Sequence, residues 1–103
     1  MNINPLFHPI RYRIIKLLLM HQLMHYKEVA RELDIDEEVA LFHLASLELM
    51  GIVQSEFKNE IKLYSLNWGK LLPYLEDARQ EIERIKKTKL QSSFVEYLEV
   101  NER

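Results

Sequence analysis

The segment 36–53, DEEVALFHLASLELMGIV, limits the possible folds of this chain more than any other part of it. Its inward apolar residues recur at intervals of three and four, which predicts a helix with one buried side. These residues are Ala40, Leu44, Leu47 and Met50. Gly51 follows them, and glycine best tolerates the left-handed backbone that often ends a helix. Because Ile52 and Val53 begin an alternating pattern, we expect the helix to end sharply and lead at once into a β-strand.

Two further helices are predicted before this segment. Pro9 suits the first turn of a helix, and apolar residues at helical spacing extend that helix over 9–22. Residues 24–26 are long enough only for a short strand, and residues 27–33 form a second amphipathic helix. The turn that follows ends at Asp36, whose carboxylate is expected to cap the next helix.

A β-hairpin and a long helix are predicted after the segment. Ile52–Phe57 and Ile61–Leu66 alternate apolar and polar residues, with a three-residue tip between them. Asn67 is placed to cap a helix, and the amphipathic spacing beyond it predicts one from about Leu72 to Lys89. The polar residues 91–93 weaken this pattern, so a separate short helix is expected at the end of the chain.

With the elements in this order, four stretches of the sequence resemble the ArsR-type repressors and their archaeal winged-helix relatives. HPIRYRIIKLL is similar to the opening helix of that family, and YKEVARELDID to its second helix and turn. VALFHLASLELMGIV resembles the third helix, here called the reading helix, and KLYSLN resembles the closing strand of the wing. The resemblance covers about residues 6–67. It implies a mainly α fold with a small β-hairpin: a winged helix-turn-helix domain at 1–67 and a C-terminal helical extension for dimerisation at 68–103.

The outward side of the reading helix departs from the family pattern. The positions that match the family's groove-facing residues are Glu37, Glu38, Val39, Leu41, Phe42, Ala45 and Ser46. The family commonly has Ser, Thr, Gln, Arg or Lys there, because base edges need hydrogen-bond partners and phosphates need cations. This helix instead has an acidic first turn and an apolar row formed by Leu41, Phe42, Ala45 and Leu49. Three interpretations stay open: Leu41 and Phe42 pack beneath the wing or the C-terminal helix, the row binds a protein, or it contacts thymine methyl groups.

Cations for phosphate contacts are expected outside the reading helix. No Lys or Arg occurs between Asp36 and Gln54, and the net charge of the chain is −2. The family contacts phosphates from its second helix and its wing, where the matching residues are Lys27, Arg31, Lys58, Asn59 and Lys62. Four such cations predict a salt slope of about −3.6 for one protomer, at about −0.9 per phosphate. The alternative is that they only solubilise the surface. Arg11 matches a recurrent arginine in the first helix of the family, which more often braces the fold than contacts DNA.

Composition excludes several other classes of protein. A length of 103 residues suffices for one domain with a modest core, and the absence of cysteine excludes disulfides, thiolate metal sites and thiol nucleophiles. No apolar run approaches the roughly 20 residues that span a bilayer, so no membrane partner is expected. The N-terminus has no basic, cleavable leader pattern, so a cytoplasmic location is expected. We expect no enzyme activity and no cofactor, since no nucleophile and base stand in a catalytic pattern.

The four histidines do not indicate a metal site. His21 and His25 are four residues apart, and imidazole is a common ligand of zinc, copper and nickel. The first helix is expected to end between them, however, and two ligands do not form a site. The metal sensors of the family use cysteines, or Asp and His on the C-terminal helix, which has no His here. His43 is interpreted as a hydrogen-bonded structural residue.

The predicted C-terminal helix has one apolar stripe that must be buried. The family pairs through this helix and the first one, which implies a two-fold homodimer here. The residues expected in the interface are Leu75, Ala78, Ile82 and Ile85. Trp68 and Leu71 are expected to hold the helix to its own domain. The alternative is that the stripe packs only within the chain.

Together these observations predict a repressor-like transcriptional regulator that binds double-stranded DNA as a homodimer. Its site is expected to be a pseudo-palindrome, with half-sites about one helical turn apart. The alternative is a winged-helix interaction module that holds a protein partner on Leu41, Phe42 and Leu49, with weak or no DNA binding.

Overall fold

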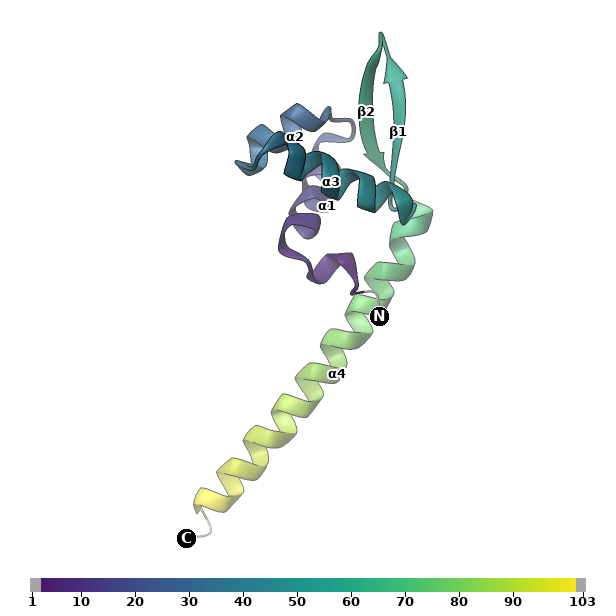
Figure 1. The fold of residues 1–103 in the computed structure, drawn as a ribbon. Helices are drawn as coiled ribbons and strands as arrows, with labels where there is room; N and C mark the ends of the chain where they lie inside the picture. Colours follow the sequence, from purple (N-terminus) through teal and green to yellow (C-terminus); the bar gives the residue numbers. More distant parts are fainter. Residues whose placement is uncertain (1–2, 102–103) are drawn as a thin grey trace.

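A computed structural model describes the backbone of residues 3–101 and the side chains of residues 3–90. Figure 1 shows the helices before the hairpin gathered with it into a head, from which the last helix extends as a long arm. This is a mainly helical winged helix-turn-helix with a long C-terminal helix, as the sequence predicts. The elements are the 3-10 helix η1 (Pro5–Phe7), α1 (Pro9–His21), α2 (Tyr26–Leu33), α3 (Glu37–Leu49), β1 (Val53–Lys58), β2 (Ile61–Leu66) and α4 (Trp68–Asn101).

The core lies where the first three helices meet the base of the hairpin. Ile14 and Leu18 of α1 pack there with Leu44 and Leu47 of α3, and all four are almost fully buried. The inward residues predicted for α2 are buried as well, whereas Met50 is only half-buried at the edge of the cluster. The apolar spacing of the sequence therefore predicts the core correctly. The other buried core residues are Ile15, Met24, Val29, Ala30, Leu33, Ala40, Ile52, Val53, Tyr64, Leu66 and Leu71.

The hairpin has a two-residue tip. β1 and β2 pair antiparallel as far as Lys58 with Ile61, so the three-residue tip predicted from the sequence is wrong by one position. The tip residues Asn59 and Glu60 both have positive φ, at 51° and 68°, which is the backbone of a tight hairpin turn that matches the strand twist. The short strand predicted at 24–26 is reduced to one bridge between Met24 and Tyr64.

The boundaries of α3 are close to the prediction, but its predicted cap is wrong. Asp36 has an extended backbone, and its carbonyl accepts the N–H of Ala40 at 3.0 Å. Its carboxylate accepts no backbone N–H of the helix, and the residue is exposed to solvent. Gly51 has a φ of 79°, so the predicted left-handed end of the helix is confirmed.

α4 is longer and more continuous than predicted. Its start is set by Asn67, whose Oδ1 accepts the N–H of Lys70 at 3.3 Å, as the sequence predicts for a cap. The helix then runs without interruption to Asn101, so the separate last helix predicted beyond 91–93 is wrong. Gln and Ser cost a helix less than about 1 kcal/mol each, which is too little to break it. Within the described residues, no helix has the length and apolar character needed to cross a membrane.

Leu71 and Asn4 help to attach α4 to the head. Leu71 is buried in the core with 1% of its surface exposed. Asn4 donates from Nδ2 to the carbonyl of Tyr74 at 2.8 Å and to Oδ2 of Asp77 at 3.2 Å. Trp68 is 56% exposed at the rim of the hairpin base, so the prediction that it holds the helix is wrong.

Candidate nucleic-acid interface

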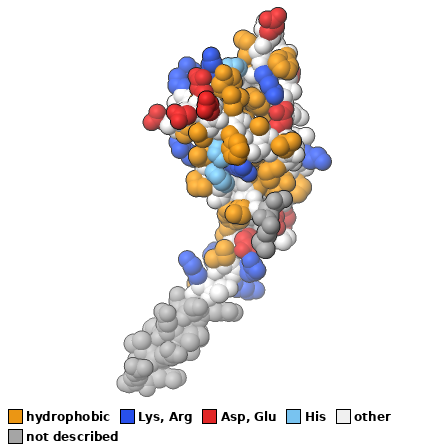
Figure 2. All heavy atoms as spheres, in the orientation of Figure 1, with side chains coloured by type: hydrophobic (Ala, Val, Ile, Leu, Met, Phe, Trp, Pro, Cys, Tyr) orange, Lys and Arg blue, Asp and Glu red, His pale blue; other side chains and the backbone are white. Residues whose placement is uncertain are grey.

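The outer face of α3 is open to solvent. Phe42 is 63% exposed and Leu49 is 91% exposed, while Leu41 is partly covered at 37%. Figure 2 shows hydrophobic side chains spread across this face of the head. The interpretation that Leu41 and Phe42 pack beneath the wing or α4 is therefore wrong for Phe42. The hairpin rises beside the C-terminal end of α3 and α4 leaves the head, so neither element covers the row (Figure 1).

The remaining groove-facing candidates differ in exposure. Glu37 and Glu38 are exposed in the first turn of α3, and Ala45 is exposed in its middle. Val39 and Ser46 are half-buried, and the Ser46 hydroxyl donates to the carbonyl of Phe42 at 3.0 Å. The face that α3 presents is therefore acidic at its start and apolar beyond it, because its one hydroxyl already has a partner on its own helix.

Arg11 braces α3 from α1. Its Nε donates to Nδ1 of His43 at 3.2 Å, and His43 is 7% exposed. The ring of His8 lies with its centre 4.8 Å from that of His43, and His8 Nδ1 accepts the backbone N–H of Arg11 at 3.4 Å. Burial lowers the pKa of His43, and the charges of His8 and Arg11 lower it further. These contacts confirm His43 as a hydrogen-bonded structural residue and Arg11 as a brace.

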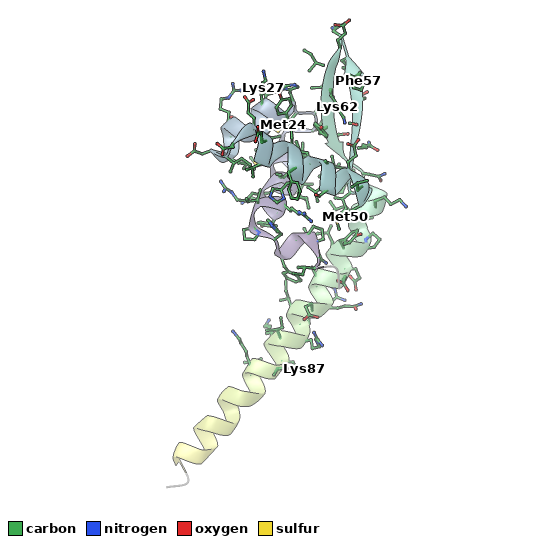
Figure 3. The ribbon with its side chains drawn as sticks, viewed as in Figure 1. Met24, Lys27, Met50, Phe57, Lys62 and Lys87 are labelled. Carbon is green, nitrogen blue, oxygen red and sulfur yellow. The ribbon has the colours of Figure 1, made fainter. Side chains whose placement is uncertain are left out.

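Three of the predicted phosphate-binding cations are exposed and unpaired. Lys27 and Arg31 lie one turn apart on α2, and Lys58 lies beside Asn59 at the end of the hairpin. None of the three cations has an ion-pair partner among the side chains of residues 3–90. Figure 3 shows Lys27 on the α2 side of the head and Lys62 on the hairpin.

Lys62, by contrast, forms an ion pair within the chain. Its Nζ lies 3.3 Å from Oε1 of Glu48 on α3 and 5.2 Å from the centre of the Tyr64 ring. The sequence contains no signal for this ion pair, because its partners are 14 residues apart and on different elements. Lys62 therefore joins the wing to α3 in the free protein.

Three of the four residues predicted for dimerisation border a hollow between η1, α1 and α4, and Ile85 lies outside it. The hollow has a volume of about 330 Å³, and Phe7 and Tyr12 line it together with Leu75, Ala78 and Ile82. Leu75, Ile82 and Ile85 are 40%, 52% and 46% exposed, whereas Ala78 is covered within the chain at 6%. An exposed apolar stripe thus continues along α4 beyond the head.

His21 and His25 lie on different elements, as the sequence predicts. α1 ends at His21, and Gln22 follows with a φ of 65°. His25 is the N-cap of α2: its Nδ1 accepts the N–H of Lys27 at 3.2 Å, and its own N–H donates to Glu28 at 3.1 Å. His25 and Glu28 have the three-residue spacing of a capping box, a signal in the sequence that the prediction did not use. Among the described residues, no three His, Asp or Glu side chains are grouped as metal ligands would be.

Solved structures of transcriptional repressors share this fold. The chain is 22% identical to a possible transcriptional regulator for arsenical resistance, with a TM-score of 0.65 over 79% of this chain and 88% of that one. It is 19% identical to the transcriptional repressor PagR of Bacillus anthracis, with a TM-score of 0.57 over 61% and 71% of the two chains. It is 17% identical to the antimony-specific transcriptional repressor AntR, with a TM-score of 0.59 over 80% and 74%. No protein-family model and no curated sequence matches the chain. The resemblance drawn from the sequence is thus confirmed for the fold.

Proposed function

We propose that this protein is a DNA-binding transcriptional regulator that acts as a homodimer on a pseudo-palindromic site. The observation that carries this proposal is the placement of free cations around the exposed face of α3. Lys27 and Arg31 lie on α2, which packs against α3, and Lys58 lies at the end of the hairpin that rises beside the C-terminal end of α3. This arrangement suits phosphate contacts on both sides of a groove that holds α3.

The charges predict a modest affinity that depends strongly on salt. Lys27, Arg31 and Lys58 give a slope of about −2.7 for one protomer, at about −0.9 per phosphate. Glu37 and Glu38 oppose phosphate at the start of α3, and Glu48 already holds Lys62. Base recognition then depends on Leu41, Phe42 and Ala45, whose apolar groups suit thymine methyls in the major groove.

The homodimer is supported by the exposed stripe on α4. Leu75 and Ile82 lie with Phe7 and Tyr12 around one hollow, and each of the four keeps two fifths or more of its surface exposed. A second copy related by a two-fold axis would bury this surface from both sides. Pairing through α1 and α4 would place two α3 helices on one DNA duplex, as a pseudo-palindromic site requires.

A second candidate function is protein binding at the same face of α3. Phe42 and Leu49 are the observation that favours it, because large apolar side chains exposed together often mark an interface. In that case the cations of α2 and the hairpin serve solubility, and DNA binding is weak or absent.

Fluorescence anisotropy with a random-sequence DNA duplex at several salt concentrations separates the two functions. Lys27→Ala and Lys58→Ala should each weaken binding and reduce the salt slope by about 0.9. Lys87→Ala is the matched control, since Lys87 is an exposed lysine far along α4 (Figure 3). Absence of binding at low salt, or equal losses in all three variants, would contradict the regulator. Loss of a protein partner on Phe42→Asp would then support the interaction module.

A further inference from the structure

A pocket of about 570 Å³ lies beside the outer face of α3, where the C-terminal half of that helix meets the start of α1. Its walls include Phe7, His8 and Arg11 on one side and Ser46, Leu49 and Met50 on the other. Met50, labelled in Figure 3, marks the end of α3 that borders the pocket. The proposed phosphate contacts do not use this space, and it shares only Phe7 with the hollow beside the stripe of α4.

The polar part of the pocket is cationic. None of its lining residues is acidic. Among the described side chains, the Arg11 guanidinium has one hydrogen-bond partner, the His43 ring, and no carboxylate partner. An arginine has five N–H donors, so most of those on Arg11 stay free for an anion. Nδ1 of His8 accepts the backbone N–H of Arg11, so Nε2 is the ring nitrogen that is left for a further hydrogen bond. Figure 2 shows histidine and basic atoms side by side within the hydrophobic surface of this face.

The rest of the pocket is apolar and exposed. Leu49 is 91% exposed and Phe7 is 44% exposed, and Met50 lies between the pocket and the core. An inorganic anion would satisfy Arg11 but leave these side chains in water. A neutral apolar molecule would cover them but leave the guanidinium without a counter-charge.

We propose that this pocket binds an organic anion with an apolar tail, such as a medium-chain carboxylate. The carboxylate accepts hydrogen bonds from the free guanidinium N–H groups of Arg11, which form a fork that suits two oxygens. The tail lies against Leu49, Met50 and Phe7. A ligand in this position contacts both α1 and α3, so it would also change the DNA affinity of α3. That coupling rests on the proposed function, whereas binding of the ligand does not.

The proposal is tested by calorimetric titration of octanoate, octanol and inorganic phosphate into the full chain without DNA. Octanoate should bind at least about tenfold more tightly than either of the other two, the effect expected from one charge-assisted contact. Leu49→Glu should weaken octanoate by about tenfold, because it places a carboxylate at the pocket while Leu49 itself makes little contact with the fold. Phe42→Glu is the matched control: it adds the same charge to the same helix outside the pocket and should leave octanoate binding unchanged.

Arg11→Gln should abolish the preference for octanoate over octanol, and Arg11→Lys should keep part of it. If loss of the Arg11 brace unfolds the Arg11 variants, comparing octanoate binding by Leu49→Glu and by Phe42→Glu still tests the proposal. Equal binding of octanoate and octanol, binding of phosphate as tight as octanoate, or no binding would overturn the proposal. So would an equal loss in Leu49→Glu and Phe42→Glu, because that result indicates unspecific adsorption to α3. All these readouts are made without DNA, so they are independent of whether the chain is a regulator.

Discussion

Nζ of Lys62 on β2 lies 3.3 Å from Oε1 of Glu48 on α3, which ties the wing to the helix beside it. The hydroxyl of Ser55 on β1 donates to the other oxygen of the same carboxylate. Burial by itself would lower the pKa of Lys62, but its hydrogen bond to Glu48 and the nearby Tyr64 and Glu48 charges raise it above the ordinary value. Lys62 is therefore a charged residue whose counter-ion is supplied by α3 and not by phosphate.

Glu48→Gln should strengthen DNA binding, because it frees Lys62 to contact a phosphate. The salt slope for one protomer should become steeper by about 0.9. The free energy of unfolding should fall by less than about 1 kcal/mol, since both side chains of the pair are one third exposed or more. Anisotropy titrations and urea unfolding measure the two effects. Glu56→Gln on β1 is the control, and an equal gain in that variant would show that net charge alone is responsible.

Replacing both Glu37 and Glu38 with Gln should also raise the affinity for random DNA, because two exposed carboxylates no longer repel phosphate. The same change should lower stability by about 0.3–1 kcal/mol for each carboxylate, since acids in the first turn interact favourably with the helix dipole. A higher DNA affinity together with a lower stability would show that the two carboxylates repel phosphate and stabilise the helix dipole. Glu83→Gln on α4 provides a control for net charge, and unchanged DNA affinity in the double variant would show that the start of α3 does not approach DNA.

Acidification should destabilise the protein through His43. The pKa of His43 is lowered by burial and by His8 and Arg11, so the unfolded chain takes up the proton more readily than the folded one. The contribution of His43 to stability is constant above the ordinary histidine pKa of 6.5 and is lost as the pH falls below it. Urea unfolding at several pH values measures this loss. His43→Gln should flatten the dependence between neutral and mildly acidic pH, while His21→Gln, at an exposed position, should leave it unchanged.

The two glycines should respond in opposite directions to alanine. Gly51 has a φ of 79°, so Gly51→Ala should cost about 1–2 kcal/mol through backbone strain, although a Cβ there would meet Lys70 only at an ordinary 3.5 Å. Gly69 lies in the first turn of α4 and has no strained φ, so Gly69→Ala should stabilise by about 0.5–1 kcal/mol. Thermal unfolding of the two variants checks the difference. A loss of stability in Gly69→Ala would contradict the assignment of residue 69 to the helix.

Ile82→Glu should convert the proposed dimer into a monomer, because it places a charge at the centre of the exposed stripe on α4. Light scattering behind gel filtration should give twice the chain mass of 12.4 kDa for the wild type and the chain mass itself for the variant. Phe57→Glu is the matched control, because Phe57 is an exposed apolar residue on the hairpin and not on α1 or α4. A wild type that elutes as a monomer at micromolar concentration would refute the dimer.

The features that the sequence predicts well are those that repeat locally. The spacing of Ala40, Leu44 and Leu47 predicts the inward side of α3, and Gly51 predicts its end, because both depend on neighbouring residues only. The capping role of Asn67 follows from the same kind of local signal. Asp36 has a residue type equally suited to a cap, but its exposed carboxylate makes no capping bond, which no local pattern reveals.

The features that escaped prediction join residues far apart in the sequence. Lys62 matched a phosphate-binding position of the family, but its Glu48 partner depends on the angle between hairpin and helix. The cationic pocket combines Arg11 with Leu49, which are brought together only when α1 packs on α3. The exposure of Phe42 likewise depends on where the wing and α4 lie, so the sequence left three interpretations open.

The hydrogen bonds from Asn4 to α4 have a consequence for the order of folding. They join residues 70 and 73 positions apart, so they cannot form until almost the whole head has been assembled between them. Contacts of such separation carry a large loop-closure entropy and contribute late to folding. Because the one amide of Asn4 bonds both η1 and α4, we expect these two ends of the head to open and close together.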